Sequence, residues 1–148
     1  MHIEILSTAL SPWQLLADYE RAQQHLHGKF GATAVFVGSM RDFNEDESIA
    51  QMHLEHYPGM TEKYLLELAA LAMEKWQLAD VLIAHRVGEV RPADTIVVVA
   101  VWSAHRAQAY EANRHIMEEL KSRAPFWKKE HTSNGESRWL EKNTPGHV

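Results

Sequence analysis

The sequence TIVVVAVW (Thr95–Trp102) is followed directly by SAHR (Ser103–Arg106). Continuous apolar and β-branched residues are typical of a strand that is covered on both faces. We therefore expect 95–102 to be a central strand of a sheet. The alternating segment 81–87 predicts a second central strand.

A helix is expected to begin at Ser103 and to stop before Pro125. Its apolar stripe consists of Ala109, Ala112, Ile116 and Leu120. His105 and Arg106 then fall in the first turn, where the helix dipole and the unpaired N–H groups disfavour a cation by about 0.3–1 kcal/mol. A docked anion reverses that sign, so the pattern predicts a phosphate-type anion pocket at the helix start.

The other elements are predicted from alternation, helical periodicity and turn residues. The expected strands are 2–6, a buried strand 32–37, 50–57 and 126–130. The expected helices run from Ser11, as N-cap, to about His27, and from Thr61 to Trp76. Arg41 follows the second strand at its exit. In the tail, we expect a turn at 133–135, an anchor at Trp139-Leu140 and disorder over 143–148.

Composition limits the class of protein. The 148 residues fit one domain, 1–148. The absence of cysteine excludes a disulfide, a thiolate metal site and a cysteine nucleophile on this chain. The formal charge of −5 argues against a general nucleic-acid binder. Because no segment reads as a signal peptide or a membrane span, a soluble cytoplasmic protein is expected, with no membrane partner.

The ten histidines do not follow a metal-binding pattern. His53 and His56 would point to opposite faces of a strand, His25 and His27 share no helical face, and H-E-x-x-H is absent. Walker-type and G-x-G-x-x-G loops are also absent. We expect no metal site and no cofactor.

Lys121 is predicted to share a helical face with Arg114 and Met117, beside the apolar stripe. Two interpretations are open. A lysine near a helix C-terminus ordinarily interacts favourably with the helix dipole in water. A partly desolvated lysine can instead act as an acid, a base or a nucleophile.

The segment Phe126-Trp127-Lys128-Lys129-Glu130 interleaves aromatic and charged residues. Alternation puts Lys128 on one face, with Phe126 and Glu130, and Lys129 on the other. The lysines could protect an edge strand. An aromatic ring beside a cation also suits a flat heterocycle that carries an anionic group.

Spacing restricts how these groups can meet. His105 and Lys121 are 16 positions apart, which is about 24 Å along one straight helix. They cannot share one small site within a chain. If both belong to one pocket, a two-fold dimer must bring the helix start of one subunit to Lys121 of the other.

Five ordered motifs resemble the large, catalytic subunit of molybdopterin synthase over residues 30 to 140. They are Gly31-Ala32 through Phe36 with Gly38 and Arg41, Leu54-Glu55-His56-Tyr57-Pro58-Gly59-Met60, His85-Arg86-Val87-Gly88-Glu89, Ser103-Ala104-His105-Arg106, and Pro125-Phe126-Trp127-Lys128-Lys129-Glu130. The resemblance implies an α+β fold of the α/β hammerhead type with an additional antiparallel β subdomain. It further implies a homodimer with a small ubiquitin-like sulfur-carrier subunit at each end, which makes a heterotetramer.

The same resemblance implies an activity and its residues. The family converts the pterin substrate cyclic pyranopterin monophosphate (precursor Z) into the dithiolene molybdopterin, with two sulfurs from the thiocarboxylated C-terminal glycine of the small subunit. Lys121 would handle proton transfer or a transient acyl bond, and Lys128 would stabilise anionic intermediates. The implied substrate-binding residues are Ser39, Met40, Arg41, Met117, Lys129 and Glu130, with His105 and Arg106 contributed across the dimer.

Two departures from the family pattern stand out. The role of the C-terminal segment 138–142, which contains Arg138, stays open, and Ala93 stands where the family often has glycine. Two other functions also stay open: a non-catalytic dimer that binds a pterin or another phosphate-bearing ligand, and a scaffold that only presents a dimer surface.

Overall fold

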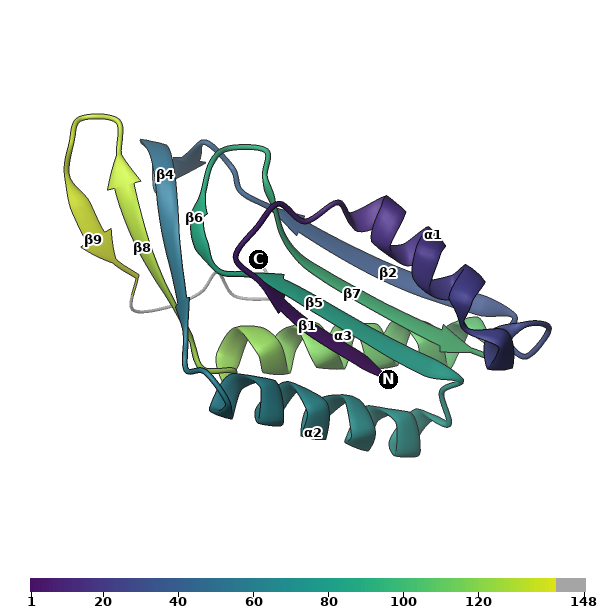
Figure 1. Cartoon of the computed structure of the whole chain (residues 1–148). Coiled ribbons are helices and arrows are strands. Elements are labelled where there is room, and N and C mark those ends of the chain that lie inside the picture. The colour runs from purple at the N-terminus through teal and green to yellow at the C-terminus, as the bar shows by residue number, and fades with distance from the viewer. Residues whose placement is uncertain (141–148) are drawn as a thin grey trace.

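A computed structural model describes residues 1–140 of the chain. Its main feature is a four-stranded sheet of order β1-β5-β7-β2 (Figure 1). These strands are β1 (His2–Leu6), β5 (Asp80–Arg86), β7 (Thr95–Ser103) and β2 (Ala32–Ser39). β1 runs parallel to β5, and the other neighbours pair antiparallel. The two inner strands are therefore the two that the sequence predicted to be central.

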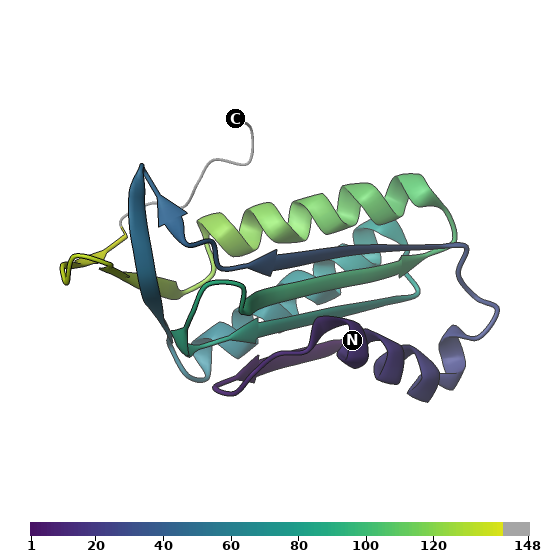
Figure 2. The same cartoon turned by 90° about the horizontal axis from the view of Figure 1, so that it is seen from above.

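Helices cover both faces of this sheet (Figures 1 and 2). α2 (Met60–Trp76) and α3 (Arg106–Ser122) lie on one face, and α1 (Pro12–Ala22) with the short 3-10 helix η1 (Gln24–Leu26) lies on the other. Along β7, Val97, Val99 and Val101 join the core under α2 and α3, whereas alternate residues such as Trp102 join the core under α1. Burial on both faces explains why this segment is apolar without a break.

A second, antiparallel sheet stands at one end of the first (Figure 1). It consists of β3 (Phe43–Asn44), β4 (Glu47–His56), β8 (Phe126–Thr132), β9 (Ser137–Trp139) and β6 (Gly88–Val90), which pairs with β4. Met40, Ile49, Leu54 and Val90 form its small core. The α+β class and the additional antiparallel sheet are thus confirmed.

Three sequence predictions were wrong in their details. The first helix ends at Ala22, and the 3-10 helix that follows carries Leu26 into the core, where it is fully buried. α3 begins at Arg106 because Ser103 is still the last residue of β7 and is buried. β2 is an edge strand rather than a buried one, so Val35 and Phe36 are exposed.

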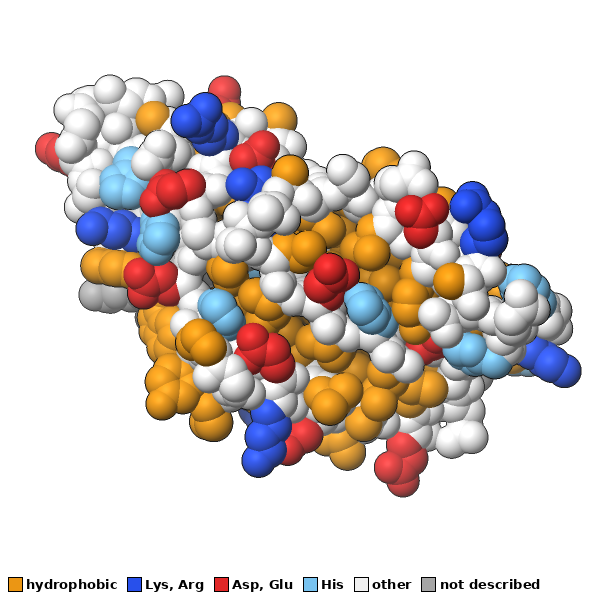
Figure 3. Space-filling view, viewed as in Figure 1, with side chains coloured by type: hydrophobic (Ala, Val, Ile, Leu, Met, Phe, Trp, Pro, Cys, Tyr) orange, Lys and Arg blue, Asp and Glu red, His pale blue; other side chains and the backbone are white. Residues whose placement is uncertain are grey.

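No helix within residues 1–140 is long and apolar enough to cross a membrane. On the face seen in Figure 3, basic side chains are interspersed with acidic ones and form no continuous basic surface. The segment 143–148, for which we expected disorder, lies outside the described residues.

Candidate functional site

Two adjoining cavities lie where the end of α3 meets β8 and the end of β2. Their volumes are about 390 and 580 Å³. Both are lined by Ser39, Arg41, Ile96, Lys121 and Lys128, and we call them together the lysine cavity. The structure therefore brings together Ser39, Arg41, Lys121 and Lys128, which are far apart in the sequence and were predicted to share a site.

The exit of β2 supplies one wall of the lysine cavity. A register shift between Gly38 and Ser39 ends the regular pairing of β2 with β7. Met40 is then fixed by two backbone hydrogen bonds, one to the Asp94 carbonyl and one from the Ala93 N–H, each of 2.9 Å. These bonds place the next residue, Arg41, at the mouth of the cavity, with its guanidinium 4.9 Å from the Phe43 ring centroid.

The two lysines come from different elements. Lys121 lies in the last turn of α3, and Lys128 lies in β8 on the same face as Phe126 and Glu130. Burial and the nearby charge of Lys121 lower the pKa of Lys128 to about 8, while Glu130 acts in the opposite direction. Lys128 is therefore mostly cationic at neutral pH but can exchange a proton at little cost. Such a group can stabilise a developing negative charge.

Glu130 is held rigidly beside this pair. Its side chain is 2% exposed. Asn44 Nδ2 donates to one carboxylate oxygen at 2.8 Å, and Arg138 Nε donates to the other at 3.1 Å. Arg138 also pairs with Glu47 at 3.1 Å. The structure thus gives Arg138 a role that the sequence left open, since it fixes a buried carboxylate of the cavity wall.

His85 lines the smaller part of the lysine cavity and was not predicted as a site residue. Its ring stacks on Phe126 with 3.9 Å between centroids and 15° between planes. Burial, followed by the charges of Lys128, Lys121 and His56, lowers its pKa to about 3, so the ring is neutral. One signal was present in the sequence: a histidine at the end of a strand that is otherwise buried and apolar.

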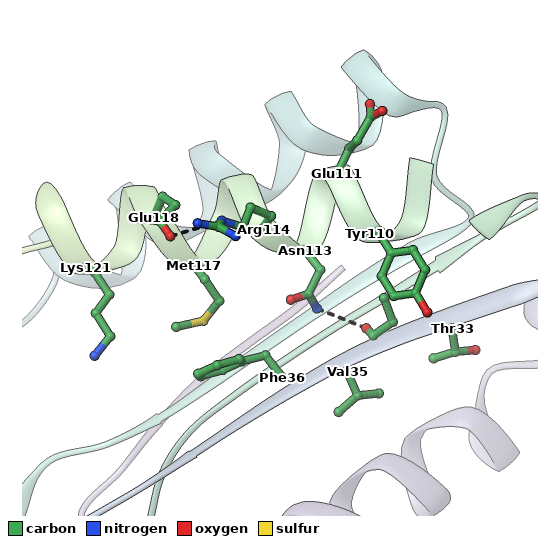
Figure 4. A pocket seen from close by; sticks show the side chains of 11 residues that line it. Thr33, Val35, Phe36, Tyr110, Glu111, Asn113, Arg114, Met117, Glu118 and Lys121 are labelled. Atoms are coloured by element: carbon green, nitrogen blue, oxygen red, sulfur yellow. Dashed lines mark hydrogen bonds and ion pairs between the residues drawn. The ribbon is translucent and has the colours of Figure 1, made fainter. Parts of the chain in front are cut away.

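A third cavity runs along α3 and the edge strand β2 (Figure 4). Its volume is about 930 Å³, and we call it the helix groove. Met117, Arg114 and Lys121 line it, which confirms that these three share a face of α3. Phe36, Val35 and Tyr110 supply apolar surface opposite and beside them (Figure 4). Lys121 therefore stands where the helix groove meets the lysine cavity.

Three predicted residues do not line these cavities. His105 and Arg106 lie exposed at the opposite end of α3, where His105 is the N-cap and Arg106 the first helical residue. Lys129 points to the other face of β8, with Nζ 5.6 Å from the Trp139 ring centroid. The prediction that Lys129 shapes the pocket edge is therefore not supported within this chain. Alternation along β8 is the physical reason.

Among residues 1–140, no group of three or more His, Asp and Glu side chains is arranged to hold a metal ion. The chemistry available at the lysine cavity is that of cations, one anchored carboxylate and one neutral imidazole.

The sequence model of the MoaE protein family matches residues 11–123. This chain belongs to the MoaE family. Among MoaE relatives, the molybdopterin synthase catalytic subunit of Ralstonia nicotianae is 52% identical over 113 residues, which are 76% of this chain and 64% of that protein. The chain thus covers less than two thirds of this relative. The catalytic subunit of Vibrio cholerae is 44% identical over 142 residues, 96% of this chain and 93% of the relative.

A solved structure agrees with the MoaE assignment. Molybdopterin synthase from Staphylococcus aureus superposes with a TM-score of 0.79 at 31% identity, covering 93% of this chain and 95% of that one. The resemblance inferred from five motifs is therefore confirmed at the level of family and fold.

Proposed function

We propose that this MoaE family member is the catalytic subunit of a molybdopterin synthase and acts as a sulfurtransferase. It would convert cyclic pyranopterin monophosphate into molybdopterin, with sulfur supplied by the thiocarboxylated C-terminus of a small ubiquitin-like subunit. The observation that carries the proposal is the convergence of Lys121, Lys128 and Arg41 on one cavity. The cytoplasm stays the predicted location.

Each cation has a distinct place in this proposal. Arg41, at the mouth of the cavity, binds the substrate phosphate. Lys121 meets the carrier's C-terminus, because it stands where the open helix groove joins the lysine cavity. There it handles proton transfer or a transient acyl bond. Lys128, whose pKa is lowered by burial, stabilises the anionic intermediates of sulfur addition.

His105 and Arg106 fit this site only in a dimer. Positions 105 and 121 are symmetric about position 113, so a two-fold axis that brings the partner subunit's His105 to Lys121 passes beside α3 at the level of Asn113, between two antiparallel copies of the helix. The surface at this point supports such an axis. Tyr110 is 71% exposed, and Val35 and Phe36 on the adjacent edge strand are 38% and 39% exposed. An exposed apolar edge strand is a ready surface for pairing with a second copy.

Single-turnover conversion of cyclic pyranopterin monophosphate, with a thiocarboxylated small subunit, tests the proposed reaction. The dithiolene product is read as a fluorescent pterin after oxidation. Lys121→Ala and Lys128→Ala are expected to lose at least about 100-fold in rate while substrate affinity changes little. Lys63→Ala, an exposed lysine on α2, is the matched control. Substrate binding without turnover by the wild type would instead favour the non-catalytic pterin-binding dimer.

A mixing experiment tests the shared site. His105→Ala and Lys121→Ala homodimers are each expected to be inactive, whereas their heterodimer contains one site with both residues intact. A mixture that exchanges subunits at random therefore recovers about a quarter of the wild-type activity. If the mixture stays inactive although the subunits exchange, the two residues do not serve a common site.

A further inference from the structure

His85 occupies a position where the strand pattern calls for an apolar side chain. It lies near the end of β5 and is 3% exposed. Ile83 and Val81, which precede it on the same face of the strand, are fully buried in the core under α2 and α3. On this face of β5, His85 thus follows two buried apolar residues and lies at the boundary between the core and the lysine cavity.

The hydrogen bond of His85 fixes the position of its proton. Nδ1 lies 2.7 Å from the carbonyl oxygen of Arg86. Because a carbonyl can only accept, Nδ1 carries the hydrogen, and in a neutral ring Nε2 is then a hydrogen-bond acceptor. The stack on Phe126 covers one ring face. Nε2, which carries no proton, is therefore the ring nitrogen that can accept a hydrogen bond from a ligand.

Acceptors are scarce in this part of the lysine cavity. Its polar and charged lining side chains are those of Ser39, Arg41, His85, Lys121 and Lys128. Three of these side chains are cationic donors, and only Ser39 and His85 keep acceptor atoms while the lysines are charged. An anionic group is well served here, but a buried N–H or O–H group of the same ligand needs an acceptor to offset its desolvation.

We propose that His85 is a substrate-binding residue that accepts, at Nε2, a hydrogen bond from an N–H or O–H group of the bound pterin. The assignment rests on the proposed function, because it presumes a pterin between Arg41, Lys121 and Lys128. It gives the cavity a means of specificity. Arg41 binds any small anion, whereas His85 favours a ligand that also presents a donor.

Two substitutions separate this role from simple packing. His85→Phe keeps an aromatic ring against Phe126 but has no acceptor, and His85→Gln restores a polar group with an acceptor near the position of Nε2. Titration calorimetry with cyclic pyranopterin monophosphate is expected to show about tenfold weaker binding for His85→Phe and near wild-type binding for His85→Gln. Sulfate, which has an anionic charge but no donor, should bind the wild type and both variants equally.

Equal pterin affinity of wild type and His85→Phe, with turnover by the wild type intact, would overturn the role of His85 alone. Failure of the wild type to bind the pterin would overturn the proposed function and this inference together. Nitrogen-15 NMR of the imidazole gives a readout that needs no ligand and no variant. A neutral ring with its proton on Nδ1 at pH 7 is expected, and a ring protonated on Nε2 contradicts the proposal.

Discussion

Arg138 faces Glu130 directly across the ladder between β9 and β8, and its Nε lies 3.1 Å from a carboxylate oxygen of Glu130. The carboxylate is buried, so removal of the guanidinium leaves a charge without its strongest partner. Arg138→Gln is expected to lower the denaturant midpoint of unfolding. Urea denaturation measures the change. Arg138→Lys, which keeps the charge, should lose less, and equal losses would show that charge is not the relevant property.

Lys128 makes stability depend on pH with a defined sign. Its pKa falls from 10.5 to about 8 on folding, so the unfolded chain binds more protons between these values, and stability rises with pH there. Relative to Lys128→Met, the wild type is expected to gain about 2 kcal/mol between pH 7 and pH 9.5. Chemical denaturation at both pH values checks this. A constant difference between the two proteins would mean that Lys128 titrates as an ordinary lysine.

Asn113 connects α3 to two strands. Its Nδ2 donates to the carbonyl oxygens of Ala34 in β2 and Val99 in β7, each at 3.0 Å. Asn113→Leu has a similar size but no donor, and we expect it to lower the free energy of unfolding by about 1–3 kcal/mol. Hydrogen exchange should quicken in β2. β1, at the opposite edge of the sheet, is the internal control. Equally faster hydrogen exchange in β1 and β2 would contradict a local role of Asn113 in holding β2 to α3.

Ala93 has a φ of 73°, in the left-handed region that favours glycine. Ala93→Gly is expected to raise the free energy of unfolding by up to about 1 kcal/mol, because relief of strain outweighs the added freedom of the unfolded chain. Thermal denaturation is the measurement. Ala70→Gly, on the exposed side of α2, should instead lower the free energy of unfolding by about 1 kcal/mol.

The inner strands and α2 could be predicted because their patterns are local. The alternation over 81–87 predicted β5, the continuous apolar run over 95–102 predicted β7, and helical periodicity predicted α2. The short strands β3, β6 and β9 could not be predicted. They have two or three residues each, and their partners lie elsewhere in the chain. The exposure of β2 likewise depends on strand order, which its own residues do not specify.

Site residues with a local sequence pattern could likewise be predicted, and those placed only by tertiary contacts could not. Lys121 and Lys128 could be singled out by their spacing beside apolar residues, whereas their choice as catalytic residues rested on the resemblance to the molybdopterin synthase catalytic subunit. Lys129 lies on the opposite face of β8, as alternation predicts, and its role at the pocket edge stays a prediction. His85 was missed because a lone histidine in a strand resembles a core residue, and only the tertiary structure brings it to the lysines.

Only Arg123, Ala124 and Pro125 join the end of α3 to the start of β8. A helix that packs on the first sheet and a strand of the second sheet are therefore linked by a very short connection, which limits the distance between the Lys121 and Lys128 side chains. The lowered pKa of Lys128 thus depends on the length of this connection as well as on the side chains around the lysine. Inserting residues there would move the Lys121 charge away from Lys128 and so remove one cause of the lowered pKa of Lys128, with every side chain of the cavity still present.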